Sequence, residues 1–145
     1  MNLIWGAILI IFTGILCWLM QAISAFWPAV ATKLGVMEPE ADVDLTFYVD
    51  VQGEAFWDTA TLWTLPVAGI LLIFNSPWWV YFGLVGGGMY LYFAGRGIAV
   101  RLVMQRQGIR VGKPETLKVV YVFLTLWGLI AIVTIIMAVT ALPLP

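Results

Sequence analysis

The residue types that most often carry chemistry are scarce in this sequence. It contains no histidine and a single cysteine, Cys17. Without histidine, bis-histidine haem ligation, most zinc and copper sites and histidine-based acid–base catalysis are excluded. One thiol forms neither an internal disulfide nor a multi-thiolate metal site, and the hydroxyls of Ser24 and Ser76 have no histidine to activate them. We therefore expect no enzymatic activity, no metal and no cofactor, while bound lipid stays open.

Acidic residues gather in one short stretch, between Glu38 and Asp58. The segment beginning Asp42-Val43-Asp44 opens like a calcium-binding loop. However, Phe47 stands where such a loop needs glycine, and Gly53 stands where it needs glutamate. A solvated acidic face, or one neutralised by a basic loop, is the preferred interpretation.

Four polar residues near the N-terminus recur at helical spacing: Thr13, Cys17, Gln21 and Ser24. On a helix they form one polar stripe. Such side chains often hydrogen-bond between membrane helices, which is the preferred interpretation. The alternative is that they form the wall of a pocket or pore.

A row of small residues occupies a later apolar segment. Gly83 and Gly87 form a GxxxG pair, and Gly95 and Ala99 continue the row. Small side chains let helix backbones approach closely, so the row predicts a tight helix crossing. The alternative is space for a flat apolar ligand such as a quinone, with the aromatic residues of segment 90–93 nearby.

The elements that must position these residues are membrane helices. Hydrophobic residues make up 63% of the chain and charged residues 10%, whereas a soluble domain is about a quarter charged. Charged residues are absent from three long stretches, and the middle one is long enough for two spans of about 20 residues. The sequence predicts one all-α transmembrane domain over residues 1–145, with four spans at about 3–26, 56–74, 78–100 and 119–142.

Turn and interface signals agree with these spans. Asn75-Ser76-Pro77 is a turn signal that separates the second span from the third. Pro66 falls inside the second span and predicts a kink, because proline lacks a backbone donor. Tryptophans lie near the predicted span ends, as in the aromatic belts of membrane proteins.

Basic residues predict the orientation of the chain. With four spans, connections 28–55 and 101–118 lie on one face of the membrane, and both termini lie on the other. The second connection and its flanks hold most of the Lys and Arg residues. The positive-inside rule therefore predicts cytoplasmic connections and outside termini, as in a bacterial inner-membrane protein. A cleaved signal peptide is the competing interpretation of the N-terminus, but no positive segment precedes the apolar run.

The first connection alternates polar and apolar residues without interruption from Asp42 to Gln52. A period of two predicts a short β-strand with one apolar face, or else a segment lying on the membrane surface. A single strand needs a partner. Segment 108–112 is a candidate, in which case Arg110 would approach Asp44 and Asp50.

The basic residues have a second interpretation besides topology. Arg96, Arg101 and Arg106 could together contact an anionic lipid at the membrane surface. Nucleic acid is not expected, because basic and acidic residues share one face and make no patch of a single sign.

These observations favour a non-catalytic membrane subunit or scaffold that packs against other membrane helices in an inner-membrane complex. The alternative is a small homo-oligomeric transporter or channel with a pocket lined by the polar stripe. A third candidate is a lipid- or quinone-binding membrane protein. A four-helix bundle has little interior, so all three predict association with lipid, with other subunits or with further copies of the chain.

Overall fold

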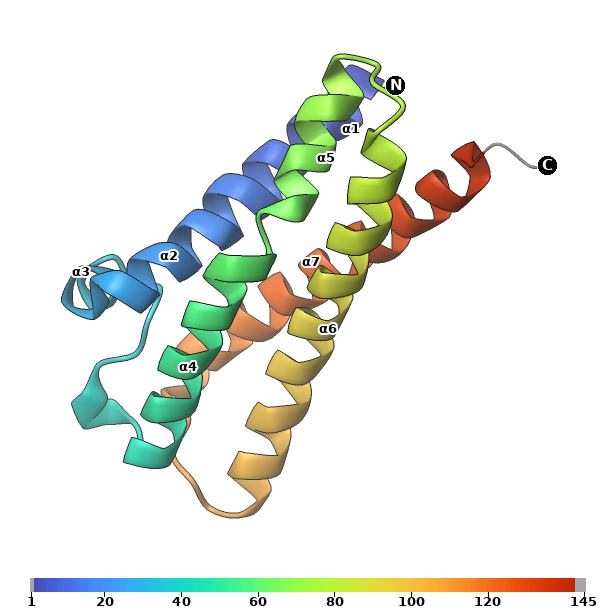
Figure 1. Ribbon diagram of the computed structural model, residues 1–145. Helices are drawn as coiled ribbons and strands as arrows, with labels where there is room; N and C mark the ends of the chain where they lie inside the picture. The colour runs from blue at the N-terminus through green and yellow to red at the C-terminus, as the bar shows by residue number, and fades with distance from the viewer. Residues whose placement is uncertain (1, 143–145) are drawn as a thin grey trace.

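A computed structural model describes residues 2–142 as a set of antiparallel helices (Figure 1). The first long segment comprises α1 (Asn2–Ile8), the π-helix η1 (Leu9–Trp18) and α2 (Leu19–Phe26). The second comprises α4 (Leu45–Thr61) and α5 (Thr64–Ile73), and the third and fourth are α6 (Trp79–Arg106) and α7 (Pro114–Ala141). The short helix α3 (Pro28–Lys33) and the 3₁₀ turn η2 (Glu40–Asp42) lie in the first connection.

Three of the long segments are long and apolar enough to cross a membrane: Asn2–Phe26, Leu45–Ile73 and Pro114–Ala141. Helix α6 is 28 residues long, but within the part of the chain that the structure describes it does not meet the same criterion of apolarity. Its hydropathy is lowered by glycines, tyrosines and arginines in its sequence. The composition of the helices is that of an integral membrane protein, and the count of four spans stays a prediction.

The predicted strand over residues 42–52 is wrong. The described residues contain no strand, and α4 begins at Leu45 and continues to Thr61. The buried residues of α4 are Phe47, Ala55 and Asp58, and Leu62, directly after the helix, is buried as well. That spacing is helical, and it extends well beyond the eleven residues that alternate. The longer helical pattern prevails because it buries one face against neighbouring helices.

The second segment is bent where proline predicted a kink. The helix is interrupted at Leu62 and Trp63, four and three residues before Pro66. Proline has no N–H to donate to the carbonyl of Leu62, and its ring crowds that carbonyl. As a result α4 and α5 follow different directions, which is visible in Figure 1.

Glycines set the closest helix approaches. A Cβ added at Gly6 of α1 would lie 2.7 Å from the carbonyl oxygen of Gly69 in α5, and the reverse distance is 2.8 Å. A Cβ at Gly86 would lie 2.6 Å from the backbone nitrogen of Leu65. These helices therefore touch backbone to backbone, which only glycine allows.

Side chains of two other helices donate hydrogen bonds to the π-helix η1. The hydroxyl of Tyr90 in α6 donates to the carbonyl of Thr13, and the indole N–H of Trp127 in α7 donates to the carbonyl of Phe12 at 2.8 Å. A π-helix is rare and usually needs outside support. Here α6 and α7 both supply donors to its carbonyls.

The two ends of the bundle differ in charge. At one end, the side chain of Asn2 donates to Asn75 in the α5–α6 turn at 2.8 Å, and the indole N–H of Trp5 donates to Thr134 of α7 at 3.2 Å. At the other end the two polar connections meet through the charged pairs Arg110–Asp44 and Lys113–Asp42. The candidate site lies between these ends, where α4 faces α6.

Candidate functional site

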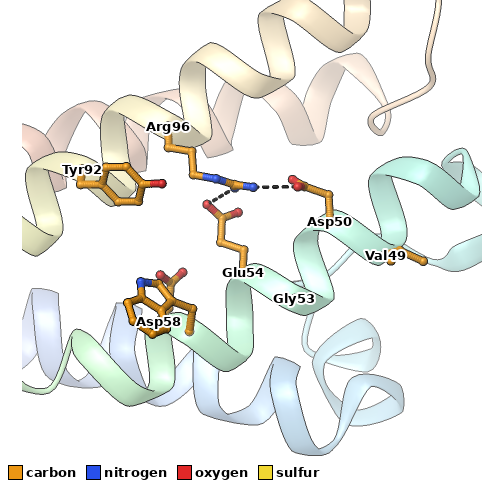
Figure 2. A pocket seen from close by; sticks show the side chains of 8 residues that line it. Val49, Asp50, Gly53, Glu54, Asp58, Tyr92 and Arg96 are labelled. Carbon is orange, nitrogen blue, oxygen red and sulfur yellow. Dashed lines mark hydrogen bonds and ion pairs between the residues drawn. The ribbon is translucent and has the colours of Figure 1, made fainter.

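Helix α4 presents three carboxylates on one face. Asp50, Glu54 and Asp58 are spaced by four residues, so their side chains lie one above another along the helix. All three line a cavity between α4 and α6, together with Tyr92 and Arg96 of α6 (Figure 2). The sequence signal for this site is the four-residue spacing of the acids.

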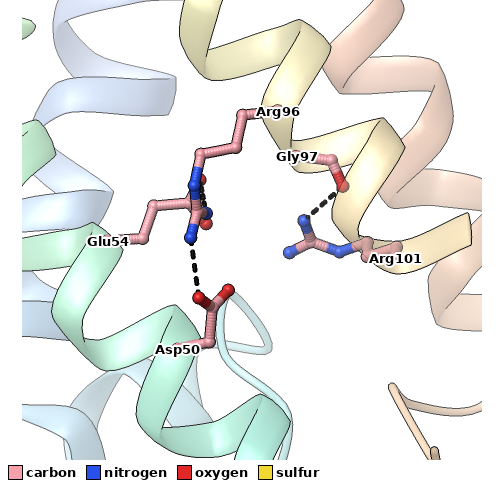
Figure 3. Close-up of polar contacts among 5 residues, drawn as sticks. All are labelled: Asp50, Glu54, Arg96, Gly97 and Arg101. Carbon is pink, nitrogen blue, oxygen red and sulfur yellow. Dashed lines mark hydrogen bonds and ion pairs between the residues drawn. The ribbon is translucent and has the colours of Figure 1, made fainter. Parts of the chain in front are cut away.

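Arg96 spans the cavity and bonds to two of the acids. One guanidinium nitrogen lies 2.7 Å from Asp50 Oδ1, and the other lies 2.6 Å from Glu54 Oε1 (Figure 3). The Glu54 side chain is 8% exposed, whereas those of Asp50 and Arg96 are about a quarter exposed. The planar fork of arginine suits such a bridge, because its N–H groups can reach two carboxylates at once.

Asp58 lies deeper and has no such partner. The residue is 4% exposed, and no donor among the described residues bonds to its Oδ2 atom. Isolated buried carboxylates are costly, so they normally bind a proton or a cation. The cavity lining holds three carboxylates and one guanidinium, so negative charge exceeds positive charge when all four groups are ionised.

The cavity has one exposed aromatic residue on each of its two helices. Its volume is about 290 Å³, and its lining is Val49, Asp50, Gly53, Glu54, Trp57, Asp58, Tyr92 and Arg96. Trp57 is 60% exposed and Tyr92 is 61% exposed. This volume is at the lower end of those of ligand sites. The site can therefore hold a small group rather than a large molecule.

Arg101 contributes to the neighbourhood but not to the bridge. Its guanidinium donates to the carbonyl of Gly97 at 2.9 Å (Figure 3). It also lies 5.3 Å from the centre of the Phe47 ring. Arg106 lies in the last turn of α6 and is exposed. Of the three arginines predicted to contact anionic lipid, Arg96 and Arg101 are thus occupied within the chain.

The predicted polar stripe lies mostly inside the bundle. Thr13, Cys17 and Ser24 are buried and Gln21 is partly buried. The hydroxyls of Thr13 and Ser24 donate to carbonyls one turn earlier in their own helix. The stripe therefore faces neighbouring helices of the same chain.

The predicted glycine row divides into two parts. A Cβ at Gly83 would contact Thr134 and Ala138 of α7, and a Cβ at Gly87 would lie 2.6 Å from Ile135. Gly95 and Ala99 lie on the exposed side of α6. No described atom lies within 4 Å of a Cβ added at Gly95.

The two polar connections contact each other through Asp44 and Arg110. The amide of Asp44 donates to the carbonyl of Arg110 at 2.9 Å, and the amide of Arg110 donates to Asp44 Oδ2 at 2.7 Å. Lys113 lies 3.0 Å from Asp42, and a small apolar cluster including Val43 and Val111 lies beneath. Asp50, also considered as a partner of Arg110, bonds to Arg96 instead.

These contacts shift the pKa values of two groups outside the helices that could cross a membrane. The backbone and side-chain donors of Arg110 lower the pKa of the Asp44 carboxyl, because they stabilise its charged form. The carboxylate of Asp42 raises the pKa of the Lys113 ammonium in the same way.

Within residues 2–142, no group of three or more His, Cys, Asp or Glu side chains is arranged to hold a metal ion. The chain matches no known family model, and no curated protein or solved structure is detectably similar to it.

Proposed function

We propose that the chain is a four-span integral membrane protein that serves as a non-catalytic subunit of an inner-membrane complex. The observation that supports it is the open outer face of α6 beside the charged cavity. No described atom lies within 4 Å of a Cβ added at Gly88 or Gly95. Glycine in a helix interior costs about 0.5–1 kcal/mol relative to alanine. A helix of another subunit packing on this face would offset that cost.

The membrane placement belongs to the same proposal. In it, α6 is the fourth span, because it packs between α5 and α7, each of which lies in a segment apolar enough to cross a membrane. The connections between α2 and α4 and between α6 and α7 are cytoplasmic, and both termini are outside, since the basic residues flank the second of these connections.

The experiment is native mass spectrometry of the protein gently extracted from its own membrane. Different chains in stoichiometric amounts would support the subunit role and name the partner. Gly95→Leu should abolish co-purification of these partner chains. Val133→Leu, a substitution on the exposed side of α7, should not. A homo-oligomer without other chains would favour the transporter or channel alternative, and a solitary monomer would contradict both.

Binding of a lipid is the second candidate, and the cavity favours it. Trp57 and Tyr92, which line the cavity, are exposed, and such aromatic residues are common at the membrane–water interface. No enzymatic activity or cofactor is part of this proposal.

A further inference from the structure

The cavity between α4 and α6 has an unbalanced charge. Asp50 and Glu54 share the one guanidinium of Arg96, and Asp58 has no cation of its own. The nearby Arg101 is occupied by the carbonyl of Gly97 and the Phe47 ring. The carboxylates therefore outnumber the positive groups available to them.

The second observation is the unsatisfied oxygen of Asp58. The residue is more than nine-tenths buried and lines the cavity, and no donor in the described part of the chain reaches its Oδ2 atom. A buried acceptor without a donor costs about 1–3 kcal/mol, and more if it is charged. A group that satisfies this oxygen must carry a donor, and a positive charge on that group would also offset the excess of carboxylates.

The residues that line the cavity indicate which chemical class of ligand could bond to Asp58. Trp57 of α4 and Tyr92 of α6 line the cavity, and both are exposed. Aromatic faces attract organic cations, and carboxylates accept hydrogen bonds from them. A quaternary ammonium has no N–H to donate, whereas a primary ammonium can bond to Asp58 while resting against the rings. The volume of about 290 Å³ suits a group of this size.

From these contacts we propose that the cavity binds a primary ammonium group next to Asp58. This inference goes beyond the subunit role and does not depend on it. The ammonium has two sources, an ethanolamine lipid headgroup or a free small amine.

The depth of the cavity makes the lipid source geometrically feasible. At about 1.5 Å per residue, Arg96 lies about 26 Å along α6 from Trp79. The hydrocarbon core of a bilayer is about 30 Å thick. If Trp79 marks one interface, the cavity lies near the other, at the level where headgroups begin.

The lipid arm of the test uses native mass spectrometry of the detergent-solubilised monomer. The protein is offered equal amounts of phosphatidylethanolamine and phosphatidylcholine with the same acyl chains. We expect about a tenfold or greater preference for phosphatidylethanolamine, the ratio that one charge-assisted hydrogen bond gives. Asp58→Asn should remove the preference, whereas Glu115→Gln, which removes an exposed carboxylate on α7, should leave it intact.

The soluble arm measures thermal unfolding with ethanolamine hydrochloride against choline chloride. If ethanolamine raises the midpoint of the wild type but not of Asp58→Asn, and neither lipid is preferred, the ligand is a free amine. Equal binding of the two lipids together with equal midpoints in the two salts would overturn the proposal. Both arms use the monomer, so their outcome is independent of whether a partner subunit exists.

Discussion

The two halves of the bent segment α4–α5 meet α6 in opposite ways. Helix α5 packs along α6 so closely that Gly86 leaves no room for a Cβ beside Leu65. Helix α4 touches α6 at few places, and the two are joined across a cavity by the ion pairs of Arg96. The break at Leu62 and Trp63 separates the halves.

Helix α6 thus serves both as a packing surface for α5 and as one wall of the cavity. Glycines on the inner face of α6 bring backbones together and exclude other atoms. Where long charged side chains replace them, the helices stand apart and leave a space that a small group can enter.

Adding one methyl group at Gly86 should disrupt the packing of α5 against α6. In Gly86→Ala the new Cβ would lie 2.6 Å from backbone nitrogen and 2.7 Å from the Cα of Leu65, so the helices must separate. Overpacking of this kind costs about 1–3 kcal/mol. Gly88→Ala is the matched control, because no described atom lies within 4 Å there.

Gly88→Ala should leave the monomer unchanged or stabilise it by up to about 1 kcal/mol through helix propensity. Unfolding of the detergent-solubilised monomer, followed by circular dichroism, measures both variants. Equal stabilities would mean that the close approach of α5 and α6 is not essential to the fold.

Substitution of Arg96 should disrupt the ion pairs that join α4 to α6. Arg96→Gln leaves the buried Glu54 carboxylate without its cation and removes a bond to Asp50. Breaking a fully buried pair costs about 3–5 kcal/mol, and the partial exposure of Arg96 reduces this to about 1–3 kcal/mol. The same unfolding measurement applies.

Removing the carboxylate of Glu54 as well should restore much of the stability that Arg96→Gln loses. Arg96→Gln combined with Glu54→Gln removes both charges of the pair, so the double variant should be more stable than Arg96→Gln alone. Arg110→Gln, which removes an exposed pair with Asp44, should have a smaller effect than Arg96→Gln. If both single arginine variants lose equal stability, the cavity pairs are no stronger than surface pairs.

The contact of α6 with the π-helix gives a third and smaller effect. Tyr90→Phe removes the hydroxyl that donates to the carbonyl of Thr13, which should cost about 1–2 kcal/mol at this buried position. Tyr92→Phe, on the exposed side of the same helix, should change stability by less than about 0.5 kcal/mol. Hydrogen exchange of residues 12–18 should rise in the first variant alone. Unchanged exchange would show that η1 does not need α6.

Much of the fold could be predicted because charge gaps and turn residues act locally. Asn75-Ser76-Pro77 separates α5 from α6, and Pro66 marks the bend. The N-terminal part of α4, before the predicted span at 56–74, was missed because residues 42–52 satisfy a period of two over a short window. Its true period becomes visible only when Phe47, Ala55 and Leu62 are read together, and their burial is decided by helices far away in sequence.

The site was less predictable than the fold for the same reason. Once residues 42–52 are assigned to a strand, Asp50 no longer shares a helix face with Glu54 and Asp58. Their four-residue spacing is visible in the sequence, but their approach to Arg96 depends on a tertiary contact. The open position of Gly95 is likewise invisible locally, because only the tertiary structure shows that α7 lies opposite Gly83 and that no described helix lies opposite Gly95.

The smallest effect is the pH dependence of the contact between the two polar connections. The lowered pKa of Asp44 means that its stabilisation is present above its ordinary value of 3.8 and is lost as the pH falls below it. The raised pKa of Lys113 means that its stabilisation is present below its ordinary value of 10.5 and is lost as the pH rises above it. The contact should therefore be strongest between these two limits. Hydrogen exchange of residues 107–113, corrected for intrinsic rates, should show protection falling at the acid limit in the wild type but not in Asp44→Asn. Because both groups are exposed, global unfolding should barely change, whereas a large global change would mean that these connections hold α4 against α6.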